Sequence, residues 1–185
     1  PPRSTLFPYT TLFRSDLMAA FRENAEVVND VLTLAYYSFA TGNSWSRAAR
    51  WQKLEKAPSS RELTPMTITR LTQSISETER MSLFKYRADR LGKDELCAVD
   101  STTRSAYGSS LADIKWGRNK ERVPLPQTSE VVVYSLDSHM PVYYRTFPGN
   151  IPDSRSVEAI LTDISHAGFP RVVLVTDRGD RKSVV

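Results

Sequence analysis

The chain has 185 residues, of which 40% are hydrophobic and 25% charged, a composition typical of one globular domain or of one domain with a helical extension. Its single cysteine, Cys97, excludes a disulfide framework and any CxxC metal or redox motif. No apolar run is long enough to span a membrane. The formal charge of +4 by itself favours an acidic partner such as nucleic acid.

Both ends of the chain resemble a translated sequencing-library adapter. Residues 1–15 (PPRSTLFPYTTLFRS) correspond codon by codon to such an adapter, and residues 180–185 (DRKSVV) correspond to its reverse complement. We interpret both segments as adapter-derived tails that pack on nothing of consequence, and we exclude them from fold reasoning. They hold four basic residues and one acid, so the rest of the chain has a net charge of only +1, and charge alone no longer indicates nucleic acid.

The first part of the chain, residues 16–93, is predicted to be a helical region. Apolar residues recur at helical spacing over residues 25–40, and Gly42 ends that helix. Ser44 is predicted to cap a second helix over residues 45–55. Thr64 and Pro65 begin a third helix, and the capping-box pattern at residues 76–79 begins a fourth that stops at Gly92.

The second part, residues 94–179, changes to a strand pattern. Residues 95–100 read as a buried strand, residues 101–127 as a connection, and residues 128–136 and 141–147 as a hairpin. An amphipathic helix follows over residues 154–167 and leads into a fully buried strand over residues 172–176. This order predicts an α/β (α+β) fold whose mixed sheet has one face covered by the crossover helix.

Two carboxylates follow buried strands in this reading. Asp100 and Asp177 each come at the end of an apolar strand, and both strands are expected to be central in the sheet. If the strands are parallel neighbours, the carboxylates converge at one edge and form a site for hard divalent cations such as Mg²⁺. The alternative is that each aspartate merely ends a strand or a turn.

Six stretches in order resemble the DDE-type insertion-sequence transposases, specifically the insertion-sequence-four-like branch. They are AVDST (98–102), KWGRNK (115–120), LPQ (125–127), MPV (140–142), FPGN with Asp153 (147–153) and VTDRG (175–179). The resemblance implies a ribonuclease-H-like core in which Asp100 and Asp177 are the first two acids of a triad that binds Mg²⁺ or Mn²⁺. It implies cleavage and strand transfer of DNA at mobile-element ends, in a prokaryotic, cytoplasmic and DNA-associated protein whose full-length form can be a homodimer, with no membrane partner.

The resemblance also shows what the chain does not contain. The family's third acid is a glutamate on a later helix, so we expect this chain to be a truncated and inactive fragment. His139 occupies a turn position where the family usually has glycine. Two other classes remain open: a ribonuclease-H-like nuclease without strand transfer, and a non-catalytic DNA-binding remnant whose helical part recognises DNA.

Several further residues are candidates for DNA contacts or chemistry. Basic side chains that could contact phosphates are Lys115, Arg118, Lys120, Arg122 and Arg178, with Trp116 beside the first of them. A solvated basic loop is the alternative for this tract. Cys97 is expected to be a small buried residue and His166 a helix-end cation rather than catalytic groups. Asp153 is expected to stabilise the start of the crossover helix.

Overall fold

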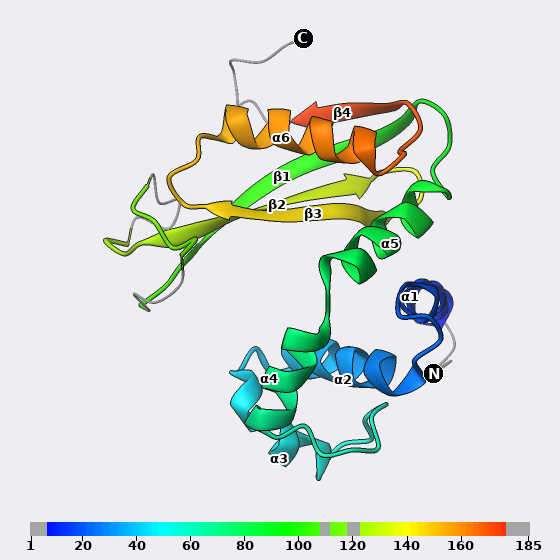
Figure 1. Cartoon of the computed structure of the whole chain (residues 1–185), viewed down its shortest axis with the longest axis vertical. Coiled ribbons are helices and arrows are strands. Elements are labelled where there is room, and N and C mark those ends of the chain that lie inside the picture. Colours follow the sequence, from blue (N-terminus) through cyan, green and yellow to red (C-terminus); the bar gives the residue numbers. More distant parts are fainter. Residues whose placement is uncertain (1–6, 108–111, 118–122, 177–185) are drawn as a thin grey trace, which may run out of the picture. The chain divides into compact units, whose positions relative to one another are not determined.

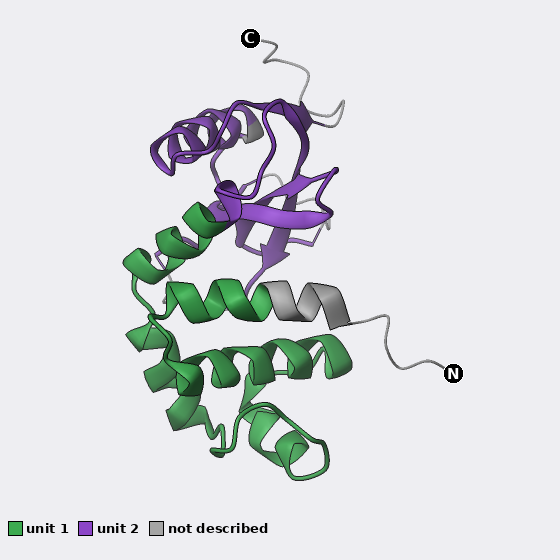
Figure 2. Ribbon diagram, turned by 90° about the vertical axis from the view of Figure 1, so that its right-hand side faces the viewer, with its two compact units in different colours: residues 1–86 green, residues 87–185 purple. Residues whose placement is uncertain are grey.

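A computed structural model describes residues 7–107, 112–117 and 123–176. The chain divides into two compact units, residues 1–86 and 87–185, which Figure 2 colours separately. Each unit is treated below by itself. Among the described residues, no helix is both long and apolar enough to cross a membrane.

The first unit is helical (Figure 1). Its elements are α1 (Phe7–Ala20), α2 (Ala25–Thr41), the 3₁₀ turn η1 (Trp45–Arg47), α3 (Ala48–Gln52), α4 (Pro65–Ser74) and most of α5 (Glu77–Ala88). Helix α1 begins inside the segment interpreted as an adapter-derived tail; the side chains of that segment that the structure describes are those of residues 13–15, of which Arg14 and Ser15 are exposed. Local capping explains where α4 begins and where α2 ends. The side chain of Thr64 accepts a hydrogen bond from the Thr67 amide directly before Pro65, and Gly42 ends α2 with a φ of 63°.

Two helix predictions differ from the structure in extent. The segment predicted as one helix over residues 45–55 is a 3₁₀ turn followed by five α-helical residues, and Ser44 makes no side-chain capping bond. Helix α5 ends at Ala88 rather than at Gly92. At its start, the Ser76 amide donates a hydrogen bond to the Glu79 carboxylate at 2.8 Å, which is one half of the predicted capping box.

The core of the helical unit forms between α2, α3 and α4. Its buried members are Leu34, Tyr37, Ala48, Leu63, Ile68 and Leu71. The rings of Tyr37 and Trp51 meet edge to face at 5.6 Å between centroids. A buried carboxylate links α2 to the segment before α4: Asp30 accepts a hydrogen bond from Ser59 Oγ at 2.6 Å and forms an ion pair with Arg61.

The second unit is a four-stranded mixed sheet crossed by one helix, as predicted, and it is compatible with a partial ribonuclease-H-like fold. Its elements are β1 (Glu95–Ser105), β2 (Gln127–Ser135), β3 (Met140–Pro148), α6 (Asp153–His166) and β4 (Val172–Thr176). The strand order is β3-β2-β1-β4, with β4 parallel to β1 and the other pairs antiparallel. The parallel pair is reached through α6, the usual crossover arrangement.

Helix α6 lies on one face of the sheet (Figure 1), and it is the helix that covers the sheet within the described part of residues 89–176. Ile160 and Ile164 on α6 are buried, as are Val99, Val131 and Val133 on the strands. Polar contacts also connect α6 to β3: Asp163 accepts a hydrogen bond from the Tyr143 hydroxyl at 2.6 Å and forms an ion pair with Arg145. We refer to the opposite side as the open face.

Candidate metal centre

Asp100 lies in the middle of β1 on the open face. The buried side chains of β1 alternate through Cys97, Val99 and Thr103, so Asp100 points away from α6 and is exposed. The prediction that the strand ends at Asp100 is wrong, because β1 continues to Ser105. Its polar second half pairs in register with β2 from Asp100↔Val132 to Ser105↔Gln127, and this ladder holds those residues in the strand.

Strand β4 lies beside β1 and runs parallel to it, as the metal-site hypothesis requires. The register extends from Glu95↔Val172 to Val99↔Thr176. Among the described strands β4 lies at the edge of the sheet, and the prediction that it is fully buried is wrong, because Val173 and Val175 are exposed. Asp177 and Arg178, the next residues in the chain, lie outside the described residues.

The open face has two halves of different chemistry, and Asp100 lies at their boundary. Toward the start of β1, its side chains are apolar: Leu96, Ala98, Tyr134, Val173 and Val175. Toward the end of β1, its side chains are polar: Thr102, Arg104, Glu130 and Thr146. Any charged ligand that reaches Asp100 is therefore better accommodated on the Arg104 side.

The donor chemistry at Asp100 fits a hard divalent cation. An exposed carboxylate supplies the oxygen that Mg²⁺ and Mn²⁺ accept, and Mg²⁺ usually keeps several water ligands beside one or two protein carboxylates. Within the part of the chain that the structure describes, no group of three His, Cys, Asp or Glu side chains is positioned to hold an ion. Asp100 alone offers one carboxylate, which is not a complete protein cage for an ion.

Of the predicted basic tract, only Lys115 is described. Its backbone forms a two-way bridge with Gln127, with N···O distances of 3.0 and 2.9 Å, so an exposed lysine is held at the start of β2. Trp116 next to it is 67% exposed, which leaves its ring accessible to a ligand. Arg118, Lys120 and Arg122 lie outside the described residues.

A close approach of two glycines, which the sequence did not predict, supports this bridge. A Cβ atom on Gly117 would lie 1.9 Å from the Gly149 carbonyl oxygen, and one on Gly149 would lie 2.2 Å from the Gln127 carbonyl oxygen. Only residues without a Cβ fit at these two positions. Both glycines occur in the stretches that carry the family resemblance, and this was the one feature of the sequence that could have drawn attention to them.

The remaining nucleophile and histidine candidates lie where the sequence placed them, in a buried strand, a turn and the last turn of a helix. Cys97 is fully buried, and burial raises the pKa of its thiol to about 11, with the carboxylates of Glu95 and Asp137 acting in the same direction. His139 is exposed and adopts a φ of 53° in the β2–β3 turn. His166 is exposed in the last turn of α6, where its Nδ1 lies 2.8 Å from the Thr162 carbonyl oxygen. Helix α6 begins at Asp153, whose side chain lies outside the described atoms.

A different carboxylate, Glu95, lies at the start of β1 and has a structural role. Glu95 is buried, pairs with Ser135 Oγ and accepts a hydrogen bond from the Gly92 amide at 2.6 Å. Burial alone would raise the pKa of Glu95, but these hydrogen bonds outweigh it and hold the pKa below the usual value. Through its contact with Ser135, Glu95 links the start of β1 to the end of β2.

Residues 91–179 match the protein-family model described as the transposase DDE domain. The match includes all four strands and α6, and it supports a DDE transposase with a general transposase function. Members of that family act on DNA and generally use divalent metal ions. No curated protein matches the chain.

Proposed function

We propose that Asp100 and Asp177 are the first two acids of a transposase active site that cleaves and transfers DNA strands at mobile-element ends. The observation that carries the proposal is the parallel register of β1 and β4. Thr176 is paired with Val99, and the residues that follow these two in the chain are Asp177 and Asp100. Continuation of the register by one residue would bring the two carboxylates side by side.

The two carboxylates would hold Mg²⁺ or Mn²⁺ through their oxygens. When bound, such ions activate the attacking hydroxyl and stabilise the charge that develops on the phosphate. The protein's own contribution is to fix the carboxylates on rigid neighbouring strands and to hold the DNA backbone. Lys115, Arg118, Lys120, Arg122 and Arg178 are proposed to contact phosphates, while Trp116 offers an aromatic surface to a base.

We further propose that the 185-residue chain does not cleave DNA by itself. Two-metal chemistry shares the charge of both ions among several carboxylates. Two aspartates would bind a divalent ion weakly and would lack the third acid of the triad. The insertion-sequence-four-like assignment and a homodimeric full-length form belong to the same proposal and rest on the order of the motifs. The proposed adapter origin of residues 1–15 and 180–185 rests on the codon match of both ends.

Metal binding tests the proposed site directly. Mn²⁺ binding to the full chain can be measured from the loss of the free-ion electron paramagnetic resonance signal. The affinity is expected to be weak in the parent and at least fivefold lower in Asp100→Asn. Asp113→Asn, which removes an exposed carboxylate from the β1–β2 connection, is the matched control and should bind Mn²⁺ as the parent does. Equal binding by parent and Asp100→Asn would contradict the assignment of Asp100.

Nicking of supercoiled plasmid in Mg²⁺ tests the proposed inactivity. The parent chain is expected to leave the plasmid intact. Strong nicking that disappears in Asp100→Ala would show that two carboxylates suffice and would contradict this part of the proposal. Nicking that persists in Asp100→Ala would locate the activity at a different site.

A further inference from the structure

We propose that Arg104 binds a DNA phosphate beside Asp100, with Glu130 fixing the orientation of its guanidinium group. This inference rests on the proposed function, because it assigns to Arg104 the positioning of the DNA that the aspartates would cleave. Arg104 is a positioning residue and touches no reacting atom.

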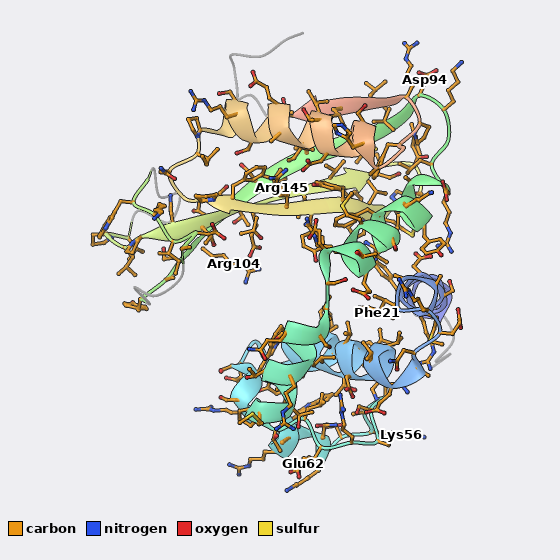
Figure 3. The ribbon with its side chains drawn as sticks, in the orientation of Figure 1. Phe21, Lys56, Glu62, Asp94, Arg104 and Arg145 are labelled. Atoms are coloured by element: carbon orange, nitrogen blue, oxygen red, sulfur yellow. The ribbon has the colours of Figure 1, made fainter. Side chains whose placement is uncertain are left out.

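Position along β1 is the first argument. Arg104 is four residues after Asp100, so both side chains lie on the open face, separated by about 13 Å at a strand rise of about 3.3 Å per residue. At a rise of about 3.4 Å per base pair, a duplex that ran along β1 would cover this separation in about four base pairs and could contact both side chains. Figure 3 shows Arg104 and Arg145 on opposite sides of the sheet, with Arg145 toward α6.

The second argument is the way in which Arg104 is held. Its Nε donates a hydrogen bond to Glu130 Oε2 at 2.9 Å across the β1–β2 ladder, while 71% of its side chain is exposed. A guanidinium group has four further N–H donors in a planar fork that matches phosphate oxygens. An exposed ion pair of this kind adds little stability, about 0–1 kcal/mol, so its main effect is to orient the guanidinium.

The third argument is the surroundings of the pair. Glu130 is paired with Thr102 on β1 and with Thr146 on β3, and both threonines are exposed on the open face. Hydroxyl and guanidinium donors are the groups that contact DNA phosphates in most complexes. The other half of the open face offers mainly apolar side chains, which suit protein rather than a phosphate backbone.

The sheet contains a matched control for this proposal. Arg171 pairs through Nε with Asp94 Oδ1, also at 2.9 Å, and its side chain is 78% exposed. This second pair lies just before β4 and β1, at the opposite end of the sheet from Arg104, as the positions of Asp94 and Arg104 in Figure 3 show. Arg104→Gln and Arg171→Gln therefore remove the same charge from the same kind of ion pair.

The experiment measures binding of the full chain to a fluorescein-labelled 30-base-pair duplex by anisotropy, in Ca²⁺ and over a range of salt concentrations. Arg104→Gln is expected to bind fivefold to tenfold more weakly, with the slope of log K against log[salt] smaller by about 0.9. Arg171→Gln should keep the parent slope, and Arg104→Lys should recover most of it. A purely structural role for Arg104 would leave the slope unchanged.

The outcomes separate this inference from the proposed function. If the parent chain binds DNA and the two glutamine variants share its slope, the role of Arg104 is wrong while the assignment of Asp100 still stands. If the parent binds no DNA, both proposals fail. Melting temperatures of the two variants within about 2 °C of each other would confirm that any difference in slope is not caused by unfolding.

Discussion

Gly117 and Gly149 meet backbone to backbone at the start of β2, where a Cβ atom on Gly117 would lie 1.9 Å from the Gly149 carbonyl oxygen. The contact joins the β1–β2 connection to the segment after β3, although the two glycines are far apart in sequence. Through the Lys115–Gln127 bridge it also fixes the only described residue of the predicted basic tract. The packing of these glycines therefore determines where Lys115 and Trp116 are presented.

Gly149→Ala is expected to destabilise the sheet unit by about 1–3 kcal/mol, because the new Cβ would lie 2.2 Å from the Gln127 carbonyl oxygen and the backbone must move. Urea denaturation followed by far-ultraviolet circular dichroism measures the change. Gly92→Ala is the control, since its Cβ would meet only Glu95 Oε2 at an ordinary 3.6 Å. Equal stability of the two variants would contradict the close approach at Gly149.

Glu95 makes the stability of the sheet unit depend on pH. Its pKa is lowered in the folded protein, so the stabilisation is complete above the ordinary value of 4.5 and is lost as the pH falls through the folded value. Glu95→Gln should be less stable than the parent at pH 7, and this difference should shrink toward pH 3. Urea denaturation at several pH values tests this, with Glu158→Gln on the exposed side of α6 as the control.

The tie between α6 and β3 depends on Asp163. Tyr143→Phe removes the 2.6 Å hydrogen bond to Asp163 and is expected to lower the free energy of unfolding by about 0.5–1.5 kcal/mol. Asp163→Ala removes the acceptor of both Tyr143 and Arg145, so it should cost more, about 1–3 kcal/mol. Tyr144→Phe, on the open face, is the control and should change the stability least. Unchanged stability in both Tyr143→Phe and Asp163→Ala would show that α6 is held by its apolar contacts alone.

Cys97 is expected to resist alkylation in the folded protein. It is fully buried, and its thiol pKa of about 11 leaves little thiolate at pH 8. Iodoacetamide labelling followed by mass spectrometry should be slow in buffer and rapid in urea, with Cys97→Ser as the unlabelled control. Rapid labelling in buffer would mean that β1 is accessible in the native state.

Elements with local signals were predicted well from the sequence. Helices α2 and α4 begin or end at residues whose own chemistry determines the boundary, namely Gly42 and the Thr64–Pro65 pair. The β2–β3 hairpin and α6 were found within one or two residues for the same reason. In each case the pattern that identifies the element lies within the element itself or next to it.

Features that depend on distant partners were not predicted. Residues 101–105 are polar and gave no apolar signal, yet they extend β1 because β2 supplies their hydrogen-bond partners. The apolar sequence of β4 indicated a fully buried strand, whereas its position at the edge of the described sheet leaves Val173 and Val175 exposed. Similarly, the Arg104–Glu130 pair and the Gly117–Gly149 contact appear only after the strands are aligned.

The strand order also determines when the candidate site can form during folding. Strands β1, β2 and β3 pair with neighbours in the chain, whereas β4 pairs with β1 across the largest sequence separation in the sheet, Val99 with Thr176. Contacts of long separation carry the greatest loop-closure cost, so β4 is expected to dock last. A cation shared by the proposed aspartates would then favour the fully assembled sheet over its three-stranded precursor, and metal would act on this unit as a folding ligand.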